Sequence, residues 1–355
     1  MSRGRRARVN RTHDIAIVGA TGVVGEMVRR VLEERSFPVC SLRLLASAAS
    51  VGMRFPFGGQ ELVVEDLACS DLHGVDFVFS CVGSSISRDF TPGAVSAGAV
   101  VIDKSDAFRM DPRIPLVVPE VNGEDLLEHQ GVVASPNCSA IPLAMVLKSL
   151  RELAPLKRVV VSTYQSVSGA GREAEDRLER EVEDLIRRGR PWSGSLTADL
   201  GEVVPRSFTT PIAFNLIPYI GVPGDDGSTD EETKMVRETR KILHLPFLPL
   251  TATAVRVPVF VGHSESINVE FSGRVTPEAA RQVLSRAPGL VVRDDRASLS
   301  FPTPREAAGK DEVFVGRIRE DPSVENGLSL WAVTDNLRKG AATNAVQIAE
   351  RLIGA

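Results

Sequence analysis

The chain has 355 residues, of which 43% are hydrophobic and 25% charged, so it is long enough to form two globular domains that each bury a core. Its formal net charge of −4 argues against nucleic acid as a partner, and no apolar run reaches the roughly 20 residues needed to cross a membrane. The four cysteines lie far apart without disulfide or metal-ligand spacing, which predicts a cytoplasmic protein with reduced thiols and no metal site.

The first part of the chain alternates short β-rich runs with helical patterns. Residues 1–13 are rich in arginine and contain no apolar stretch, and we expect a solvated tail there. Apolar runs follow at residues 15–20, 42–47, 75–82, 99–104 and 116–121, with a helical pattern after the first. Continuous apolar runs are typical of parallel strands buried on both faces. We therefore predict an α/β fold that begins with a Rossmann-like, doubly wound dinucleotide-binding domain over residues 1–137.

The second part of the chain, residues 138–337, has a different pattern. An apolar helix is followed by a strand, by a charged helix whose spacing suits an exposed face, and by further strands. The expected helices span residues 140–150 and 172–189, and the expected strands span 158–167, 251–260, 265–271, 312–318 and 328–336. We predict an α+β domain with a mixed, largely antiparallel sheet, and a final helix at 338–355 that packs back onto the first domain.

A glycine-rich turn follows the first predicted strand. The segment DIAIVGATGVVGEMV places Gly19, Gly22 and Gly25 at the head of a helix, where small residues let the backbone approach a pyrophosphate. We assign cofactor binding to this turn, including Thr21, Val23 and Val24. The spacing is G-x-x-G-x-x-G rather than G-x-G-x-x-G, so a turn with a purely structural role stays open as an alternative.

The end of the second predicted strand bears on the choice between NAD and NADP. An acidic residue there would bond the ribose 2′-hydroxyl of NAD, and the segment LLASAASVGM has none. Ser47 and Ser50 can donate hydrogen bonds to a 2′-phosphate. The segment therefore favours NADP, although no arginine stands between the two serines.

Cys138, in VVASPNCSAIPLAMVLKSL, is the candidate nucleophile. Pro142 fits only the first turn of a helix, so the helix should begin near Ser139 with Cys138 at its N-terminus. The positive end of the helix dipole favours a thiolate at that position. A buried cysteine with a packing role is the alternative.

A thiolate nucleophile needs an acid/base partner, and His263 is the candidate among the five histidines because it directly follows an apolar strand. A packed histidine is the alternative.

Arg109, Lys234 and Arg256 are candidates for binding phosphate or carboxylate, although an isolated cation is usually a surface charge. Arg256 differs because a charge inside the apolar run TATAVRVPVF needs a partner.

These segments together resemble aspartate-semialdehyde dehydrogenases over nearly the whole chain, from Asp14 to the C-terminus. Eight motifs occur in the family's order: GATGVVG, VVPEVN, SPNCS, STYQSVSGAG, AFNLIP, EETKM, RVPVFVGHSES and LWAVTDNLRKGAATNAVQIAE. The resemblance implies NADPH-dependent reduction of L-4-aspartyl phosphate to L-aspartate 4-semialdehyde with release of phosphate. This step belongs to the biosynthesis of lysine, threonine, methionine, isoleucine and diaminopimelate. The resemblance also implies a homodimer or homotetramer joined through the second domain, which would be both catalytic and dimerising.

The resemblance also assigns roles to individual residues. Cys138 would attack the acyl phosphate and form a thioester, and His263 would act as the acid/base. Gln165 would orient the intermediate, and Asn137 would help to polarise it. The substrate-binding residues would be Arg109 and Lys234 for the phosphate, Arg256 for the α-carboxylate and Glu231 for the α-ammonium group, with Ser168 beside them. The cofactor pocket would add Gly83, Gly169 and Asn336.

Four positions depart from the family pattern. Ala49 stands where many members carry the arginine that binds the 2′-phosphate, and Met53 stands where a lysine is common. NAD therefore stays open as a cofactor beside NADP. Lys104 and Asp106 replace the usual asparagine and the usual serine or threonine before Arg109, and Lys104 either adds to the phosphate site or simply differs.

Two other functions stay open. An N-acetyl-glutamyl-phosphate reductase would use the same thioester chemistry, but an acetylated nitrogen has no charge for Glu231 to pair. A non-catalytic nucleotide-binding relative, acting as a scaffold or sensor, is at odds with the presence together of Cys138, Gln165, Arg256 and His263.

Overall fold

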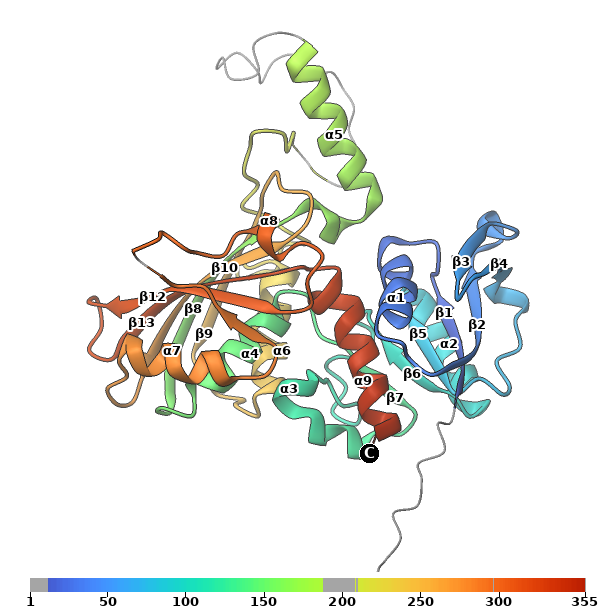
Figure 1. Cartoon of the computed structure of the whole chain (residues 1–355), viewed down its shortest axis with the longest axis horizontal. Coiled ribbons are helices and arrows are strands. Elements are labelled where there is room, and N and C mark those ends of the chain that lie inside the picture. The colour runs from blue at the N-terminus through green and yellow to red at the C-terminus, as the bar shows by residue number, and fades with distance from the viewer. Residues whose placement is uncertain (1–11, 188–207, 209, 296, 355) are drawn as a thin grey trace, which may run out of the picture.

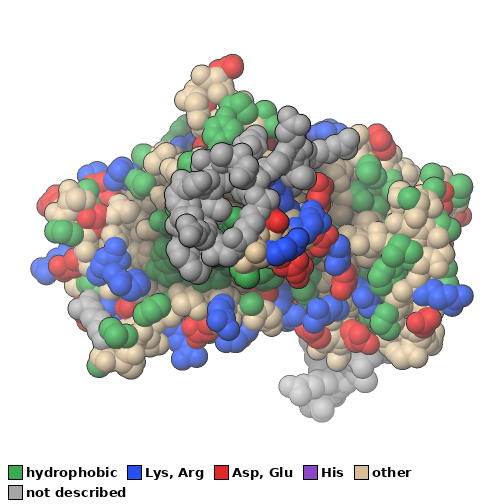
Figure 2. Space-filling model, turned by 90° about the horizontal axis from the view of Figure 1, so that it is seen from above, with side chains coloured by type: hydrophobic (Ala, Val, Ile, Leu, Met, Phe, Trp, Pro, Cys, Tyr) green, Lys and Arg blue, Asp and Glu red, His purple; other side chains and the backbone are tan. Residues whose placement is uncertain are grey.

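The structure, a computed structural model, describes residues 12–187, 208, 210–295 and 297–354 and contains two sheets that lie side by side (Figure 1). It confirms the predicted fold class, a doubly wound α/β part followed by an α+β part with a mixed sheet. Within these ranges, no helix combines the length and apolarity that a membrane span requires. Figure 2 looks down on the molecule from the side of α5 (Arg172–Arg187) and shows Lys and Arg side chains interspersed with Asp and Glu.

The first sheet has seven strands in the order β3-β4-β2-β1-β5-β6-β7, and every neighbouring pair is parallel except β3 and β4. Alternate residues of β1 enter two different cores, Ile15 and Ile17 on one face and Ala16 and Val18 on the other, so the sheet is buried on both sides. The strands are β1 (His13–Val18), β2 (Val39–Ala46), β3 (Arg54–Phe57), β4 (Gln60–Asp66), β5 (Phe77–Ser80), β6 (Val100–Asp103) and β7 (Val132–Ala134).

The strand order reverses between β1 and β5, which lead into α1 (Val23–Glu34) and α2 (Ser84–Ser96). In an open parallel sheet the crevice for a ligand lies outside the carboxyl ends of the strands at such a switch point. The predicted glycine turn, residues 19–25, is at this place. The fold therefore directs the N-termini of two helices toward one crevice.

The second sheet has six strands in the order β11-β12-β13-β10-β8-β9. Its three central pairs are antiparallel, and the two edge pairs, β11 with β12 and β8 with β9, are parallel. The strands are β8 (Leu156–Gln165), β9 (Leu250–Arg256), β10 (His263–Phe271), β11 (Leu290–Val292), β12 (Val313–Asp321) and β13 (Gly327–Thr334). The helices of this part are α4 (Ala140–Leu150), α5, α6 (Asp230–Ile242), α7 (Pro277–Arg286) and α8 (Pro304–Ala307).

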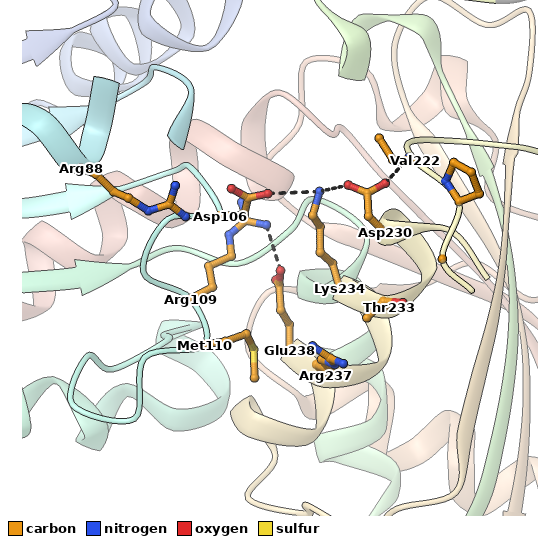
Figure 3. A pocket seen from close by; sticks show the side chains of 12 residues that line it. Arg88, Asp106, Arg109, Met110, Val222, Asp230, Thr233, Lys234, Arg237 and Glu238 are labelled. Carbon is orange, nitrogen blue, oxygen red and sulfur yellow. Dashed lines mark hydrogen bonds and ion pairs between the residues drawn. The ribbon is translucent and has the colours of Figure 1, made fainter. Parts of the chain in front are cut away.

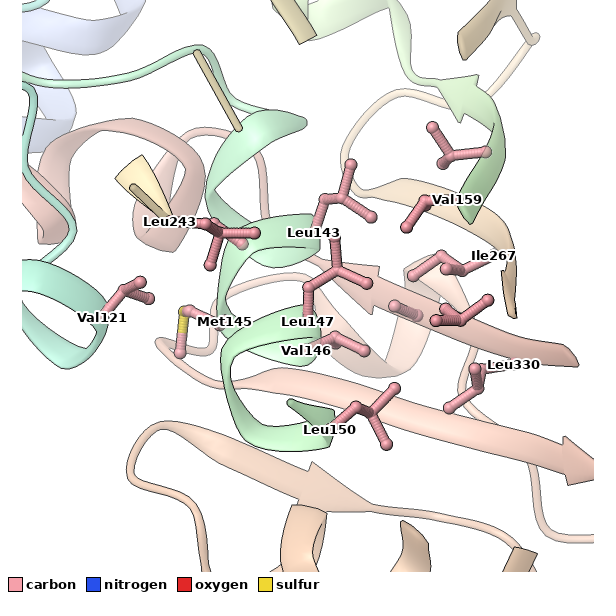
Figure 4. Close-up of a cluster of buried hydrophobic side chains, with 14 of the residues drawn as sticks. Val121, Leu143, Met145, Val146, Leu147, Leu150, Val159, Leu243, Ile267 and Leu330 are labelled. Atoms are coloured by element: carbon pink, nitrogen blue, oxygen red, sulfur yellow. The ribbon is translucent and has the colours of Figure 1, made fainter. Parts of the chain in front are cut away.

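Helix α4 forms the centre of the second core. All its residues except Lys148 are buried, as expected of a helix that is apolar all round. In Figure 4, Leu143, Leu147 and Leu150 point toward the sheet residues Val159, Ile267 and Leu330. This packing holds the N-terminus of α4, and with it Cys138, in a fixed position relative to β8 and β10.

The end of the chain returns to the first sheet. A π-helical turn, Arg338–Ala342, leads into α9 (Thr343–Gly354), whose Ala345, Ile348 and Ala349 belong to the core of the first sheet (Figure 1). Lys339 in the π-helical turn is fully buried and lies 2.6 Å from Glu120. The division of the chain at residue 137 stays a prediction.

Two predicted segments differ from the structure. The run at 116–121 is not a strand: Leu116 makes a single bridge to Ala134, and the chain then turns into α3 (Pro119–Asn122), since proline favours the first turn of a helix. His13 does not belong to a solvated tail, because it begins β1, is buried against Phe77 and lies 3.2 Å from Asp76. Residues 1–11, and residues 188 and 189 of the predicted charged helix, lie outside the described residues.

Candidate active site

A cavity of about 400 Å³ opens where α1 and α2 begin and faces the second sheet. Its walls combine the loops of the first sheet with the N-terminus of α4, the end of β8, the first turns of α6 and the end of β9. Eight predicted catalytic and substrate-binding residues line it: Arg109, Asn137, Cys138, Gln165, Ser168, Glu231, Lys234 and Arg256. The fold thus brings together side chains that are widely separated in the sequence.

Cys138 directly precedes α4. The helix begins at Ala140 with Ser139 as its N-cap, which is the start that Pro142 predicts. The cysteine lines the cavity and is partly exposed to it, although protein groups surround most of the residue. A Cβ atom added to Gly340 would lie 3.1 Å from the Cβ of Cys138, so the chain after β13 packs closely against the nucleophile.

Burial and the neighbouring charges act on the pKa of Cys138 in opposite directions. Burial raises the pKa of Cys138 to about 11, and the negative charge of Glu231 adds to this rise. Three cations offset it only in part: Lys104, Arg256 and Arg109. Burial thus opposes the thiolate that the helix N-terminus favours, and the role of Cys138 as nucleophile stays a prediction.

Glu231, in the first turn of α6, is held beside Cys138 by two amide side chains. Its Oε1 accepts hydrogen bonds from Asn137 Nδ2 at 2.9 Å and from Gln165 Nε2 at 3.2 Å. Gln165 Nε2 also donates to Ser139 Oγ at 3.0 Å. In this structure Asn137 and Gln165, predicted to polarise and orient an intermediate, both orient Glu231.

His263 lies behind the cavity wall. It is 1% exposed, and its Nδ1 accepts a hydrogen bond from the backbone N–H of Ser166 at 3.1 Å. That bond places the proton on Nε2, which has no hydrogen-bond partner among the described residues. A Cβ atom on Gly169, which lines the cavity, would lie 3.2 Å from this Nε2. Burial, with help from Arg256, holds the pKa of His263 well below its usual value, so the imidazole is a neutral donor.

Arg256 is a buried cation at the same wall. It is 5% exposed, and its Nη1 donates to the backbone oxygen of Ser166 at 2.6 Å. Its Nε has no hydrogen-bond partner among the described residues. A buried guanidinium with free N–H groups is suited to bind a carboxylate in two places.

Arg109 and Lys234 lie together, as the predicted phosphate pair requires, but protein groups already bind both (Figure 3). Arg109 donates to Glu238 Oε1 at 2.9 Å, to the Ser135 oxygen at 3.0 Å and to the Lys104 oxygen at 2.7 Å. Lys234 Nζ is 2.7 Å from Asp230 and 3.3 Å from Asp106. An anion that binds here must compete with carboxylates.

Sequence reasoning missed two residues of the site and left a third undecided. Glu238 is buried and binds both Arg109 and the Asn137 N–H, the latter at 2.6 Å. Its position, four residues after Lys234 on one helix, was a signal that could have identified it. Ser166 contacts His263, Arg256 and Asn336. It lies within the motif STYQSVSGAG, but nothing in that motif distinguishes its role from the roles of the neighbouring serines.

Lys104 adds a cation next to Cys138. Its Nζ donates to the backbone oxygens of Pro136 at 2.9 Å and Gly340 at 3.2 Å. Burial, together with the charge of Arg109, lowers the pKa of Lys104 to about 8. The residue therefore ties together the two segments that flank the nucleophile and lowers the pKa of its thiol.

The turn after β1 fits a dinucleotide. Gly19 has a φ of +82°, and a Cβ atom on Gly25 would lie 2.2 Å from the Gly19 oxygen, so side chains are excluded where the backbone must be closest to a pyrophosphate. Neither Gly22, which precedes α1, nor Gly83, which precedes α2, caps its helix with a side chain. Both helices therefore offer free N–H groups to an anion.

The remaining predicted cofactor residues fall into two groups. Thr21 Oγ1 lies 3.5 Å from Ser50 Oγ, so the glycine turn and the short 3₁₀ turn after β2 are neighbours, and Ser47 is exposed beside them. Asn336 is buried, accepts from the Gly262 N–H at 2.9 Å and donates to Ser168 Oγ at 2.9 Å. Val24, Gly83, Gly169 and Asn336 line the cavity that contains Cys138.

Two family descriptions match the chain in turn. Residues 14–129 match the NAD binding domain of semialdehyde dehydrogenases, and residues 147–339 match their dimerisation domain. The chain is 49% identical to the aspartate-semialdehyde dehydrogenase of Aquifex aeolicus, over 96% of this chain and 97% of that protein. It is 44% identical to that of Bacillus subtilis, over 95% of this chain and 96% of the relative.

Solved structures give the same result. Aspartate semialdehyde dehydrogenase II from Vibrio cholerae matches with a TM-score of 0.90 and 42% identity, covering 97% of this chain and 99% of that chain. The structure of the same enzyme complexed with ASA matches equally well. The chain therefore belongs to the aspartate-semialdehyde dehydrogenase family.

Proposed function

We propose that the protein reduces L-4-aspartyl phosphate to L-aspartate 4-semialdehyde with NADPH and releases phosphate, and that the reaction passes through a thioester on Cys138. The observation that carries this proposal is the single cavity lined by Cys138, Glu231 and Arg256. A thiol, a carboxylate and a buried guanidinium match the acyl, ammonium and carboxylate groups of an aspartyl substrate.

Substrate binding changes the charge around Cys138. The α-ammonium group of the substrate pairs with Glu231, and its α-carboxylate pairs with the free N–H groups of Arg256. Glu231 raises the pKa of the Cys138 thiol, so neutralising this carboxylate lowers that pKa. The nucleophile is therefore activated most when the correct amino acid is bound.

Acyl transfer follows from this arrangement. The sulfur of Cys138 attacks the carbonyl carbon, a C–S bond forms, and the C–O bond to phosphate breaks with its electron pair leaving on the phosphate. The thiol proton passes to the departing phosphate, so atoms and charge balance. Arg109 and Lys234 bind the leaving group.

A nicotinamide nucleotide held by the glycine turn and by the residues around Gly83, Gly169 and Asn336 would supply the hydride that reduces the thioester. His263 donates a hydrogen bond from Nε2 to the carbonyl oxygen as that oxygen gains negative charge, because its Nδ1 is fixed as an acceptor by Ser166. The resulting thiohemiacetal oxyanion collapses: the C=O bond re-forms, the C–S bond breaks with its electron pair leaving on sulfur, and the aldehyde is released. The Cys138 thiolate then takes a proton from solvent, which restores the thiol. Gln165 and Asn137 maintain the position of Glu231 throughout.

The cofactor, assembly and compartment complete the proposal. The match to an NAD binding domain supports a nicotinamide nucleotide, and Ser47 and Ser50 with no nearby acid favour NADP over NAD. The match to a dimerisation domain supports a dimer, which we propose to be a homodimer, or a pair of dimers as a homotetramer. Four free cysteines fit the reducing cytoplasm.

The test is NADPH formation from L-aspartate 4-semialdehyde, with NADP and NAD run side by side. We expect phosphate-dependent activity that NADP supports better than NAD, and Cys138→Ala should abolish it while leaving nucleotide binding intact. Activity that is independent of phosphate, or that survives in Cys138→Ala, would contradict the proposal. Preference for the acetylated glutamyl substrate would favour the related reductase instead.

A further inference from the structure

Asp106 connects the two parts of the molecule at the predicted phosphate site. It lies in the loop after β6, and one carboxylate oxygen accepts a hydrogen bond from the hydroxyl of Ser84 at the start of α2. The other oxygen is 3.3 Å from Lys234 Nζ on α6. Lys234 is also 2.7 Å from Asp230, so its ammonium group lies between two carboxylates (Figure 3).

Two cavities meet at this ion pair. The catalytic cavity of about 400 Å³ and a neighbouring cavity of about 460 Å³ share Asp106, Arg109 and Lys234 in their walls. The neighbouring cavity is also lined by Arg88, Arg237, Asp230 and Glu238 (Figure 3). With the shared residues, four cations and three carboxylates face it, so a small excess of positive charge attracts anions. A phosphate that comes through this second cavity meets the Asp106–Lys234 pair before it reaches Cys138.

The two cations predicted to bind phosphate have protein anions as partners. Arg109 is 2.9 Å from Glu238, and Lys234 is bound by Asp230 and Asp106. A phosphate bound beside any of these carboxylates is repelled by it. Phosphate binding therefore requires one carboxylate to move away.

Asp106 is the carboxylate best able to move. Glu238 is 1% exposed and also binds the Asn137 N–H, and Asp230 accepts from the Val222 N–H at 2.7 Å on the same helix as Lys234. The side chains of Asp106 and Asp230 are equally exposed, at 42% and 43%, so exposure does not separate them. The partners of Asp106 are a hydroxyl and an ammonium group, both of which can rotate, and among the described residues no backbone N–H holds it as one holds Asp230. The Ser84 hydrogen bond and the Lys234 charge lower the pKa of Asp106, so the group that moves is negatively charged at neutral pH.

We propose that Asp106 is a specificity-determining residue that competes with phosphate for Lys234. It binds this cation between turnovers, gives way when the acyl phosphate arrives, and returns as the product phosphate departs. This inference rests on the proposed function, because it takes Lys234 as part of the phosphate site. The consequence is low affinity for inorganic phosphate and therefore weak inhibition of the reduction by its own product.

The experiment compares the KM for inorganic phosphate in semialdehyde-dependent NADPH formation between the wild type and Asp106→Asn. Asparagine keeps the size of the side chain and can still accept from Ser84, but it removes the charge that repels phosphate. We expect a KM for phosphate that is roughly two- to fivefold lower, the range for a partly exposed charge interaction. A decrease confined to the KM for phosphate, with no matching decrease in the KM for NADP, distinguishes competition at Lys234 from a general change in the site.

Two variants act as controls. Asp106→Glu keeps the charge and should restore the wild-type KM for phosphate. Asp89→Asn removes an exposed carboxylate of α2 that lines neither cavity, and its KM for phosphate should match the wild type. An unchanged or higher KM for phosphate in Asp106→Asn would overturn the inference, as would an equal decrease in Asp89→Asn.

A second measurement does not depend on catalysis. Inorganic phosphate should raise the midpoint of thermal unfolding more in Asp106→Asn than in the wild type, because at a given concentration the ligand that binds more tightly stabilises the folded state more. If the wild type forms no NADPH from the semialdehyde, the proposed function fails, whereas this titration still tests Asp106. If Asp106→Asn does not fold, the same titration compares Asp106→Ser with the wild type. Equal stabilisation of the variant and the wild type by phosphate contradicts the inference.

Discussion

Cys138 and Lys104 illustrate how burial changes the charges that a local sequence suggests. A cysteine at a helix N-terminus and a lysine in a polar loop both favour charged forms in isolation. In the structure, burial raises the pKa of Cys138 to about 11 and lowers the pKa of Lys104 to about 8. Neither shift is readable from neighbouring residues in the chain, because each depends on groups that only the fold brings close.

Glu265 is a buried acid that the proposed mechanism does not use. It lies two residues after His263 on β10, is 1% exposed, and neither carboxyl oxygen has a hydrogen-bond partner among the described residues. Burial raises the pKa of Glu265 well above its usual value. The unfolded chain therefore loses this proton at lower pH than the folded protein does.

We predict that Glu265→Gln stabilises the protein increasingly as the pH rises. Below the unfolded pKa of about 4.5 the carboxyl is neutral in both states, so the substitution has little effect there. Above it, ionisation favours the unfolded wild type, and by neutral pH the variant should be more stable by roughly 1–3 kcal/mol. Denaturant unfolding across pH 4.5 to 8 measures this difference. The control Glu152→Gln, at an exposed position, should leave the free energy of unfolding unchanged over this pH range. A difference between Glu265→Gln and the wild type that shrinks with rising pH would contradict the prediction.

At the scale of single elements, the sequence predicts an element best where one residue restricts the backbone. Pro142 fixes the start of α4, and the glycines after β1 fix the turn into α1. The same reasoning fails at residues 116–121, where the apolar run continues across Pro119 although the strand does not. Apolar character alone does not distinguish a buried strand from a buried turn of helix.

The glycine turn provides the prediction at this scale. Gly25→Ala puts a Cβ atom 2.2 Å from the Gly19 oxygen, so the turn must open. The backbone of an opened turn is no longer placed to approach the pyrophosphate closely, and the affinity for NADP should fall roughly tenfold or more. Gly93→Ala is the matched control, because it lies within α2 with nothing inside 4 Å, and it should add about 0.5–1 kcal/mol of stability. Fluorescence titration measures the affinity, and unchanged binding in Gly25→Ala would contradict the assignment of this turn.

At the scale of the whole molecule, patterns in the sequence predict both sheets, and the resemblance identifies the candidate site. The contacts within the site are not predictable in this way. Asn137 and Glu231 bond across 94 positions of sequence, and Arg109 and Glu238 bond across 129. These pairs form because α4 and α6 pack together under the second sheet, while the loops of the first sheet meet them from the other side.

The central claim is that Cys138 carries the acyl group during turnover. The direct measurement mixes the protein rapidly with L-aspartate 4-semialdehyde and NADP without phosphate, follows NADPH, and then analyses the quenched protein by mass spectrometry. We predict a burst of NADPH limited by the number of active sites, with an aspartyl group on the peptide that contains Cys138, which added phosphate removes. Continued NADPH formation with no acyl group on that peptide would contradict the account.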